Sequence, residues 1–155
     1  MTVALAPRPA LANDPALRPV ISFHGVGKTY ASGTVALRDV DLAIYQRDFV
    51  FLVGASGAGK STLVRLLIRD EPASSGRIFV DGQEVTRMSR RRLPKLRRKF
   101  GIVFQDYKLL PTQTVGQNVA FALQVTLPGQ RHMREKVEET LWIVGLEDKI
   151  NKFPD

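Results

Sequence analysis

The fold of this 155-residue chain is decided by the stretch FVFLVGASGAGKSTLVRLL, which runs from Phe49 to Leu67. The apolar residues 49–53 predict a strand, and residues 62–67 have the composition of a helix. A glycine-rich run ending in Lys60 and Ser61 lies between them. Strand, glycine loop and helix in this order predict a phosphate-binding loop, because backbone N–H groups and the positive helix end converge there.

Each residue type in the loop has a chemical reason. Gly54 and Gly59 are expected to turn the backbone through conformations closed to residues with a Cβ, and Gly57 to let the main chain approach phosphate oxygens closely. Lys60 adds a charge that can reach the β- and γ-phosphates, and the Ser61 hydroxyl can bind Mg²⁺. The residues predicted to contact a nucleoside triphosphate here are Gly54, Ala55, Ser56, Gly57, Ala58, Gly59, Lys60, Ser61 and Thr62.

Composition bounds the class of protein. A chain of 155 residues is long enough for one domain with a core. Its content of 44% hydrophobic and 25% charged residues is typical of a soluble globular protein. It has no cysteine, which excludes disulfides and thiolate metal sites and fits a reducing compartment such as the cytosol. No apolar run approaches the roughly 20 residues of a membrane-spanning helix. Residues 1–19, rich in alanine and proline, predict a disordered leader ahead of a domain over residues 20–155.

The net charge of +8 is concentrated in one basic segment, residues 87–99, which has no acidic residue. Its eight cations are Arg87, Arg90, Arg91, Arg92, Lys95, Arg97, Arg98 and Lys99. A solvated face, an anionic lipid surface and a nucleic-acid surface are all compatible with this charge. The first two are favoured, because no aromatic side chains alternate with the cations to stack on bases.

The remaining patterns predict strands around the loop and helices after it. Residues 20–25, 37–44, 76–80 and 83–86 read as strands of an antiparallel layer, with Asp81-Gly82 as a hairpin turn. Residues 101–104 predict a buried strand with Gln105 at its carboxyl end, where sheet proteins place ligand contacts. Thr114 and Gln117 have capping-box spacing before one helix, and a second helix is expected from Met133 to Gly145.

Taken together, these motifs make the chain resemble the nucleotide-binding domain of ABC ATPases, and within that family the FtsE-type cell-division subunits. The stretches that carry the resemblance are 49–67, LPKLRRKFGIVFQDYKLL over 93–110, TVGQNVAFAL over 114–123 and VGLEDKINKFPD over 144–155. The resemblance implies an α/β fold of the P-loop NTPase class: an antiparallel β subdomain, a truncated parallel-sheet core and the start of a helical subdomain.

The resemblance also implies roles for two residues outside the loop. Tyr30 matches the aromatic residue that stacks on adenine. The alternative interpretation is that Tyr30 only packs at the edge of a loop. Gln105 matches the glutamine that reaches Mg²⁺ and the attacking water. Lys60 and Gln105 are then the expected catalytic residues, and Ser61 and Gln105 the expected metal contacts, with ATP and Mg²⁺ as cofactors. Arg47 stands where the family usually has a glycine.

For the whole assembly, the resemblance implies a homodimer of ATP-binding domains, peripheral on the inner face of the cell membrane, driving an integral membrane partner resembling FtsX. An ATP-binding subunit of a substrate transporter would share every loop residue. A nucleic-acid-binding module using residues 87–99 is the alternative of another class. The family's signature motif, Walker B strand with its catalytic glutamate, and switch histidine have no match among these 155 residues, so we expect MgATP binding without turnover, and an unpaired edge in the parallel core.

Overall fold

The computed structural model describes residues 18–154, and the chain divides into two compact units, residues 1–97 and 98–155. The predicted leader over residues 1–19 lies outside the described residues except for its last two positions. The boundary between the units falls inside the basic segment, residues 87–99, directly after Arg97.

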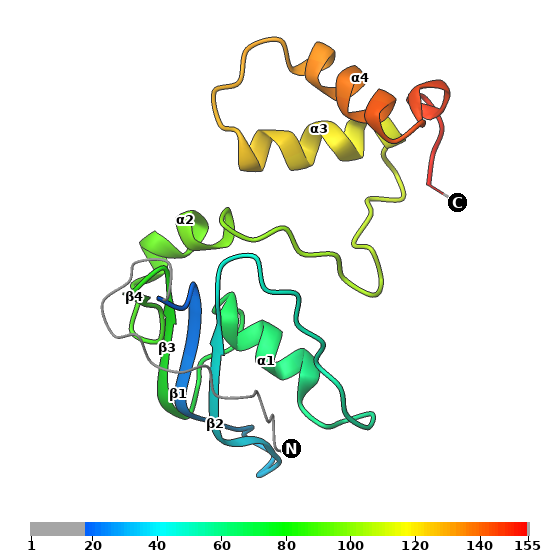
Figure 1. Ribbon diagram of the computed structural model, residues 1–155. Helices are drawn as coiled ribbons and strands as arrows, with labels where there is room; N and C mark the ends of the chain where they lie inside the picture. The colour runs from blue at the N-terminus through cyan, green and yellow to red at the C-terminus, as the bar shows by residue number, and fades with distance from the viewer. Residues whose placement is uncertain (1–17, 155) are drawn as a thin grey trace. The chain divides into compact units, whose positions relative to one another are not determined.

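The first unit is built on a four-stranded antiparallel sheet with strand order β2-β1-β3-β4. Its strands are β1 (Ile21–Thr29), β2 (Val35–Ile44), β3 (Ser75–Val80) and β4 (Gln83–Glu84). Both residues of the Asp81-Gly82 turn have positive φ, of 48° and 70°, as a tight hairpin between β3 and β4 requires. The antiparallel layer predicted from the sequence is confirmed (Figure 1).

The sheet buries the apolar face that the sequence pattern predicts. Val40 and Leu42 of β2 are buried while Asp39 and Asp41 are exposed, so the two-residue period of the strand separates core from solvent. Phe23 pairs with Leu42 on one side and with Ile78 on the other. Burying such side chains stabilises the unit by about 1.5–3 kcal/mol each.

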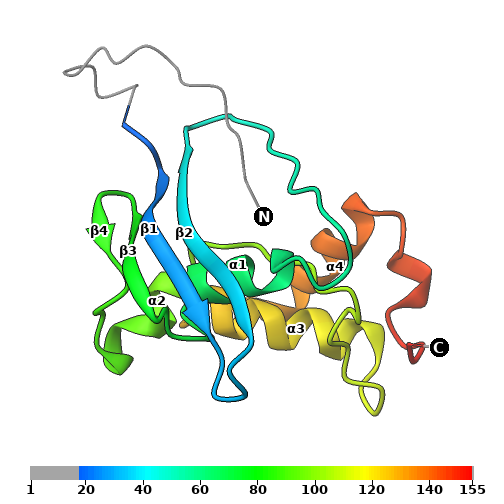
Figure 2. The ribbon, with the colours of Figure 1, turned by 90° about the horizontal axis from the view of Figure 1, so that it is seen from below.

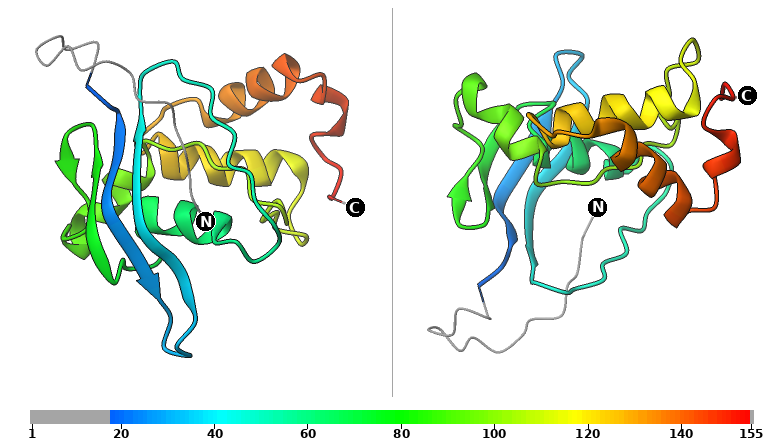
Figure 3. Two further views of the ribbon diagram at one scale, coloured as in Figure 1. Left: turned by 60° about the horizontal axis from the view of Figure 1, so that its bottom comes forward. Right: turned by 90° about the horizontal axis from the view of Figure 1, so that it is seen from above.

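Helix α1 (Lys60–Leu67) lies beside β2 on one face of this sheet (Figures 1 and 3). It buries Leu63 and Leu66, which follow one another at helical spacing. Figure 2 shows the long connection from β2 to α1 swinging away from the strands before it enters the helix.

The predicted strand over residues 49–53 is wrong. These residues precede the loop in an irregular segment, and Phe49, Phe51 and Val53 are 85%, 76% and 78% exposed. The rings of Phe49 and Phe51 contact one another edge to face at 4.9 Å, as alternate side chains of an extended segment do. A strand forms only where a neighbour pairs its backbone groups, and no described strand pairs with this segment.

The turn that leads into this segment takes the shape for which a glycine was expected. Arg47 has a φ of 68°. The Asp48 side chain accepts a hydrogen bond from the Tyr45 backbone N–H at 2.9 Å, and the Asp48 N–H donates to the Tyr45 carbonyl at 3.1 Å. These contacts stabilise the turn against the cost of about 1 kcal/mol or more for a left-handed residue with a Cβ.

The first unit ends inside the basic segment, residues 87–99, and its part of the segment is folded as a short helical layer. It comprises the 3₁₀ turn η2 (Arg90–Arg92) and helix α2 (Leu93–Arg97). Met88 and Leu96 are its buried anchors, whereas all eight cations are exposed. Two apolar side chains thus anchor this layer in the core.

The second unit is a pair of helices, α3 (Val115–Thr126) and α4 (Met133–Ile143), followed by the 3₁₀ turn η3 (Glu147–Lys149). Thr114 and Gln117 form the predicted capping box at the start of α3. Gly145 ends α4 with a φ of 69°, as predicted for a stop. The strand predicted over residues 101–104 is wrong for the same reason as the first: the segment has no described neighbour, and Val103 is 87% exposed.

Candidate phosphate-binding site

The loop ahead of α1 is shaped by two glycines in the left-handed region. Gly57 has a φ of 76° and Gly59 a φ of 90°, whereas Gly54, expected to take such a conformation, does not. The Ala58 N–H donates to the Ala55 carbonyl at 3.1 Å and closes the tight turn between them. The positive φ angles therefore fall in the second half of the loop, where it enters the helix.

Gly59 is required for a second reason. A Cβ at this position would lie 2.5 Å from the Ala36 carbonyl oxygen and 2.8 Å from the Leu37 side chain, both on β2. Only a glycine lets the loop pass this close to the strand. The start of α1 is consequently fixed against β2, and the loop is presented from a rigid base.

The amino-terminal end of α1 has no anion of its own. Gly59 is the N-cap and supplies no side-chain hydrogen bond, and the first turn contains no acidic residue. The first backbone N–H groups of a helix lack intrahelical acceptors, and together they carry a partial positive charge. This end therefore offers donors and positive potential to a ligand such as a phosphate chain.

Lys60 lies over the same loop. Its Nζ donates to the carbonyls of Gly54 and Ala55, both at 2.7 Å. The side chain therefore curls back along the rim of the loop, and its charge is held by neutral acceptors with no carboxylate. A phosphate group would be a stronger acceptor than these carbonyls, because charge-assisted hydrogen bonds are about twice as strong as neutral ones.

A magnesium ion fits this site only together with a nucleotide. Ser61 is exposed at the start of α1 and offers a hydroxyl oxygen, a ligand type suited to Mg²⁺. Among residues 18–154, no three His, Cys, Asp or Glu side chains are grouped so that they could hold a metal alone. Phosphate oxygens would have to complete the coordination.

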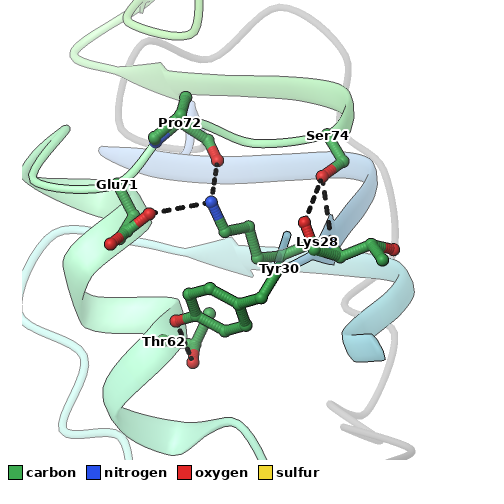
Figure 4. A network of polar contacts seen from close by, with 7 residues as sticks. Lys28, Tyr30, Thr62, Glu71, Pro72 and Ser74 are labelled. Atoms are coloured by element: carbon green, nitrogen blue, oxygen red, sulfur yellow. Dashed lines mark hydrogen bonds and ion pairs between the residues drawn. The ribbon is translucent and has the colours of Figure 1, made fainter. Parts of the chain in front are cut away.

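Tyr30 and Thr62 are brought together by the fold. The Tyr30 hydroxyl lies 3.1 Å from Thr62 Oγ1, which links the end of β1 to the first turn of α1 (Figure 4). The Lys28 ammonium lies 4.9 Å from the centre of the Tyr30 ring. Lys28 is only 6% exposed and also binds Glu71 at 2.8 Å and the Pro72 carbonyl at 2.9 Å.

Sequence reasoning missed Lys28 and Glu71. Val26, Gly27 and Lys28 of β1 are all buried, and the pairing of β1 with β2 is irregular between Val26 and Lys28. Because burial does not alternate at this end of the strand, the sequence pattern carries no signal for a lysine in the core. The partner was not visible there, because Glu71 lies 43 residues further along the chain.

Gln105 belongs to the second unit, whereas the loop before α1, Tyr30 and Thr62 belong to the first. It is exposed in an irregular segment directly after residues 101–104. Beside it, the Lys108 ammonium donates to the Asp106 carboxylate and holds the pKa of that carboxyl below its usual range. The approach of Gln105 to a bound metal stays a prediction.

The eight cations of the basic segment, residues 87–99, differ in what they bind. Arg97 donates to the carbonyls of Ile68 and Arg69 at the end of α1, at 3.1 and 3.2 Å, and Arg98 donates to the Val125 carbonyl at 2.9 Å. Arg87 faces Glu84 at 3.9 Å. Part of the cluster is therefore structural.

Helices long and apolar enough to cross a membrane do not occur among the residues that the structure describes.

A family model described as ABC transporter matches residues 37–155. The cell division ATP-binding protein FtsE of Streptococcus pneumoniae is 41% identical over 136 residues, which cover 88% of this chain and 59% of that protein. The methionine import ATP-binding protein MetN of Helicobacter hepaticus is 38% identical, over 87% of this chain and 38% of that protein. The chain thus spans about three fifths of the FtsE relative's length.

A solved structure shows the same fold. The ATP-binding cassette MJ0796, a dimer in a post-hydrolysis state bound to ADP and Pi, superposes with a TM-score of 0.78 at 31% identity. The match covers 86% of this chain and 61% of the cassette. The predicted fold class, the P-loop NTPase fold of ABC ATPases, is confirmed.

Proposed function

Since the chain belongs to the ABC transporter family, we propose that it is the phosphate-binding part of an ATP-binding subunit. One observation carries the proposal: the uncapped start of α1 has no acidic residue in its first turn and carries Lys60, whose ammonium binds the carbonyls of the loop before the helix. A triphosphate supplies the anion that this end of the helix lacks.

The roles follow from the geometry of the loop. Backbone N–H groups between Gly57 and Thr62 would bind the β-phosphate, and Lys60 would move from the loop carbonyls to the β- and γ-phosphates. Ser61 would contribute a hydroxyl to Mg²⁺, which neutralises phosphate charge when bound. Tyr30 would contact the adenine, and Gln105 the metal and the attacking water.

Calorimetric titration of the chain with MgATP tests this proposal. Binding to the unaltered chain and its loss in Lys60→Ala are expected, because the hydrogen bonds of Lys60 go to carbonyls of its own loop and removal of this side chain leaves the core intact. Lys95→Ala is the matched control, since Lys95 is an exposed lysine of α2 and its removal changes the net charge equally. Equal affinity of Lys60→Ala and Lys95→Ala would refute the proposal.

We further propose that the complete subunit acts in cell division. The identity of 41% to a protein named for cell division supports this role. The dimeric state of the MJ0796 cassette supports the further proposal that two copies of the complete subunit form a homodimer. In this proposal the subunit lies on the inner face of the cell membrane and drives an integral membrane partner resembling FtsX. Co-expression with tagged FtsX, followed by affinity purification, is expected to recover both chains in equal amounts.

The importer alternative has its own support, the 38% identity to a methionine import protein. Co-expression with a methionine permease in place of FtsX separates the two proposals. Recovery with the permease and not with FtsX would overturn the cell-division role while leaving ATP binding untouched.

A further inference from the structure

We propose that Lys28 is a positioning residue that holds the Tyr30 ring for the adenine of a bound nucleotide. This inference rests on the proposed ATP-binding function and deepens it. It assigns a task to a buried lysine that makes no contact with the phosphate loop itself.

The Lys28 ammonium is held in place by contacts other than the one with the Tyr30 ring. Glu71 Oε2 and the Pro72 carbonyl accept two of its hydrogens, at 2.8 and 2.9 Å. Both acceptors lie in the segment that follows α1, so the lysine ties the end of β1 to that segment (Figure 4). A buried ammonium that is paired and hydrogen-bonded stays in one geometry.

The Tyr30 ring is then held at two points. The ammonium lies 4.9 Å from the ring centre, within the range of a cation–π contact. The hydroxyl is held by Thr62 Oγ1 at 3.1 Å, on the first turn of α1. Lys28 binds the ring itself and Thr62 binds its polar end, so the ring has little freedom to turn.

Restraining the ring matters for binding because ordering a free side chain on association costs free energy. A ring already held in place lets the base stack without that cost. Lys28 lies over one face of the ring. In this proposal the base stacks on the opposite face. Lys28 therefore acts on the adenine, whereas Lys60 acts on the phosphates.

The prediction separates two parts of affinity. Lys28→Met removes the charge and keeps a long apolar chain. It is expected to weaken MgATP binding by about twofold to tenfold, the fold-change that corresponds to ordering one free side chain on association. Binding of magnesium tripolyphosphate, which has no base, is expected to be unchanged. Lys28→Arg keeps a cation near the ring and is expected to restore most of the affinity for MgATP.

Calorimetric titration with both probes decides the matter, with Lys95→Met as the control for net charge. If the unaltered chain binds neither probe, the proposed function fails and the inference with it. If it binds both, two results overturn the inference alone. Lys28→Met could weaken the binding of both probes equally, which would be a structural effect, or it could leave the binding of MgATP unchanged. Should Lys28→Met not fold, Glu71→Gln, whose carboxylate is only partly buried, replaces it with the same expected split between the probes.

Discussion

At the scale of single residues, the phosphate loop depends on two glycines that do different work. Gly57 has a φ of 76° with open space around its Cα, so only its backbone conformation requires glycine. Gly59 has a φ of 90° and also lies where a Cβ would meet β2. The same residue type therefore serves conformation at one position and close packing at the other.

This difference predicts unequal costs. Gly57→Ala is expected to lower the free energy of unfolding by about 1–2 kcal/mol, the price of a left-handed residue. Gly59→Ala is expected to cost clearly more, because its methyl group would also lie 2.5 Å from the Ala36 carbonyl oxygen. Urea unfolding followed by circular dichroism measures both, and equal losses would contradict the packing role of Gly59.

The Asp106 carboxyl provides a prediction of pH dependence. The hydrogen bond from the Lys108 ammonium lowers its pKa, so its contribution to stability is present above the usual aspartate pKa and is lost as the pH falls through the lowered value. Lys108→Met is expected to raise the pKa of Asp106 toward its usual range. An NMR titration of the carboxyl measures this. Lys136→Met, which removes a lysine paired with Glu139, is the control and should leave Asp106 unchanged.

At the scale of elements, helix ends are stabilised both by side chains that are close in the sequence and by side chains that are distant in it. Thr114 and Gln117 cap α3 from within four residues of sequence, with the Thr114 N–H donating to Gln117 Oε1 at 2.8 Å. The end of α1 is instead bound by Arg97, which lies 28 and 29 residues away from the carbonyls it contacts. Both contacts satisfy backbone groups that a helix end leaves open.

The capping box makes a local prediction. Thr114→Ala is expected to cost about 1 kcal/mol and to speed hydrogen exchange in the first turn of α3. Thr114→Ser keeps the hydroxyl acceptor and is expected to stay within a few tenths of a kcal/mol of the unaltered chain. If serine proves as destabilising as alanine, the hydroxyl is not what stabilises the helix start.

The contact of Arg97 with the end of α1 leads to a prediction about residues that are far apart in the sequence. Arg97→Ala is expected to lower the free energy of unfolding by about 1.5 kcal/mol, because it leaves the two carbonyls directly after α1, those of Ile68 and Arg69, without a charged donor. Arg91, an exposed cation of η2 in the same basic segment, is the matched control, and Arg91→Ala is expected to be neutral. Urea unfolding compares the two, and similar losses would show that the segment acts through its total charge.

At the scale of the molecule, each unit leaves an apolar segment open. Residues 49–53 in the first unit and 101–104 in the second have exposed large side chains and pair with no described strand. Such exposed apolar stretches with free backbone groups favour association with other chains.

This exposure predicts how the chain behaves in solution. Replacing Phe49 and Phe51 together by serine is expected to reduce aggregation and leave the unfolding midpoint nearly unchanged, because both rings lie outside the core. Phe23→Ser, at a residue that is 1% exposed, is expected to unfold the first unit and serves as the contrast. Light scattering and thermal unfolding report the two effects. A large loss of stability in the double variant would place these rings in a packed core.

The sequence by itself determined what depends on neighbours along the chain: the glycine-rich turn before α1, α1 itself, the Asp81-Gly82 hairpin, the Thr114 cap and the stop at Gly145. Each of these is specified within a few residues, by backbone conformation or a short hydrogen bond. It also indicated the β layer, through alternation in β2.

Only the tertiary structure decided which distant groups meet. The same apolar pattern that forms β2 predicted strands over residues 49–53 and 101–104, but a strand exists only when another strand pairs with it, and periodicity carries no information about the partner. In the same way, the packing of α1 against the sheet brings together two pairs of residues that are distant in the sequence. Lys28 and Glu71 are 43 residues apart, and Tyr30 and Thr62 are 32 residues apart.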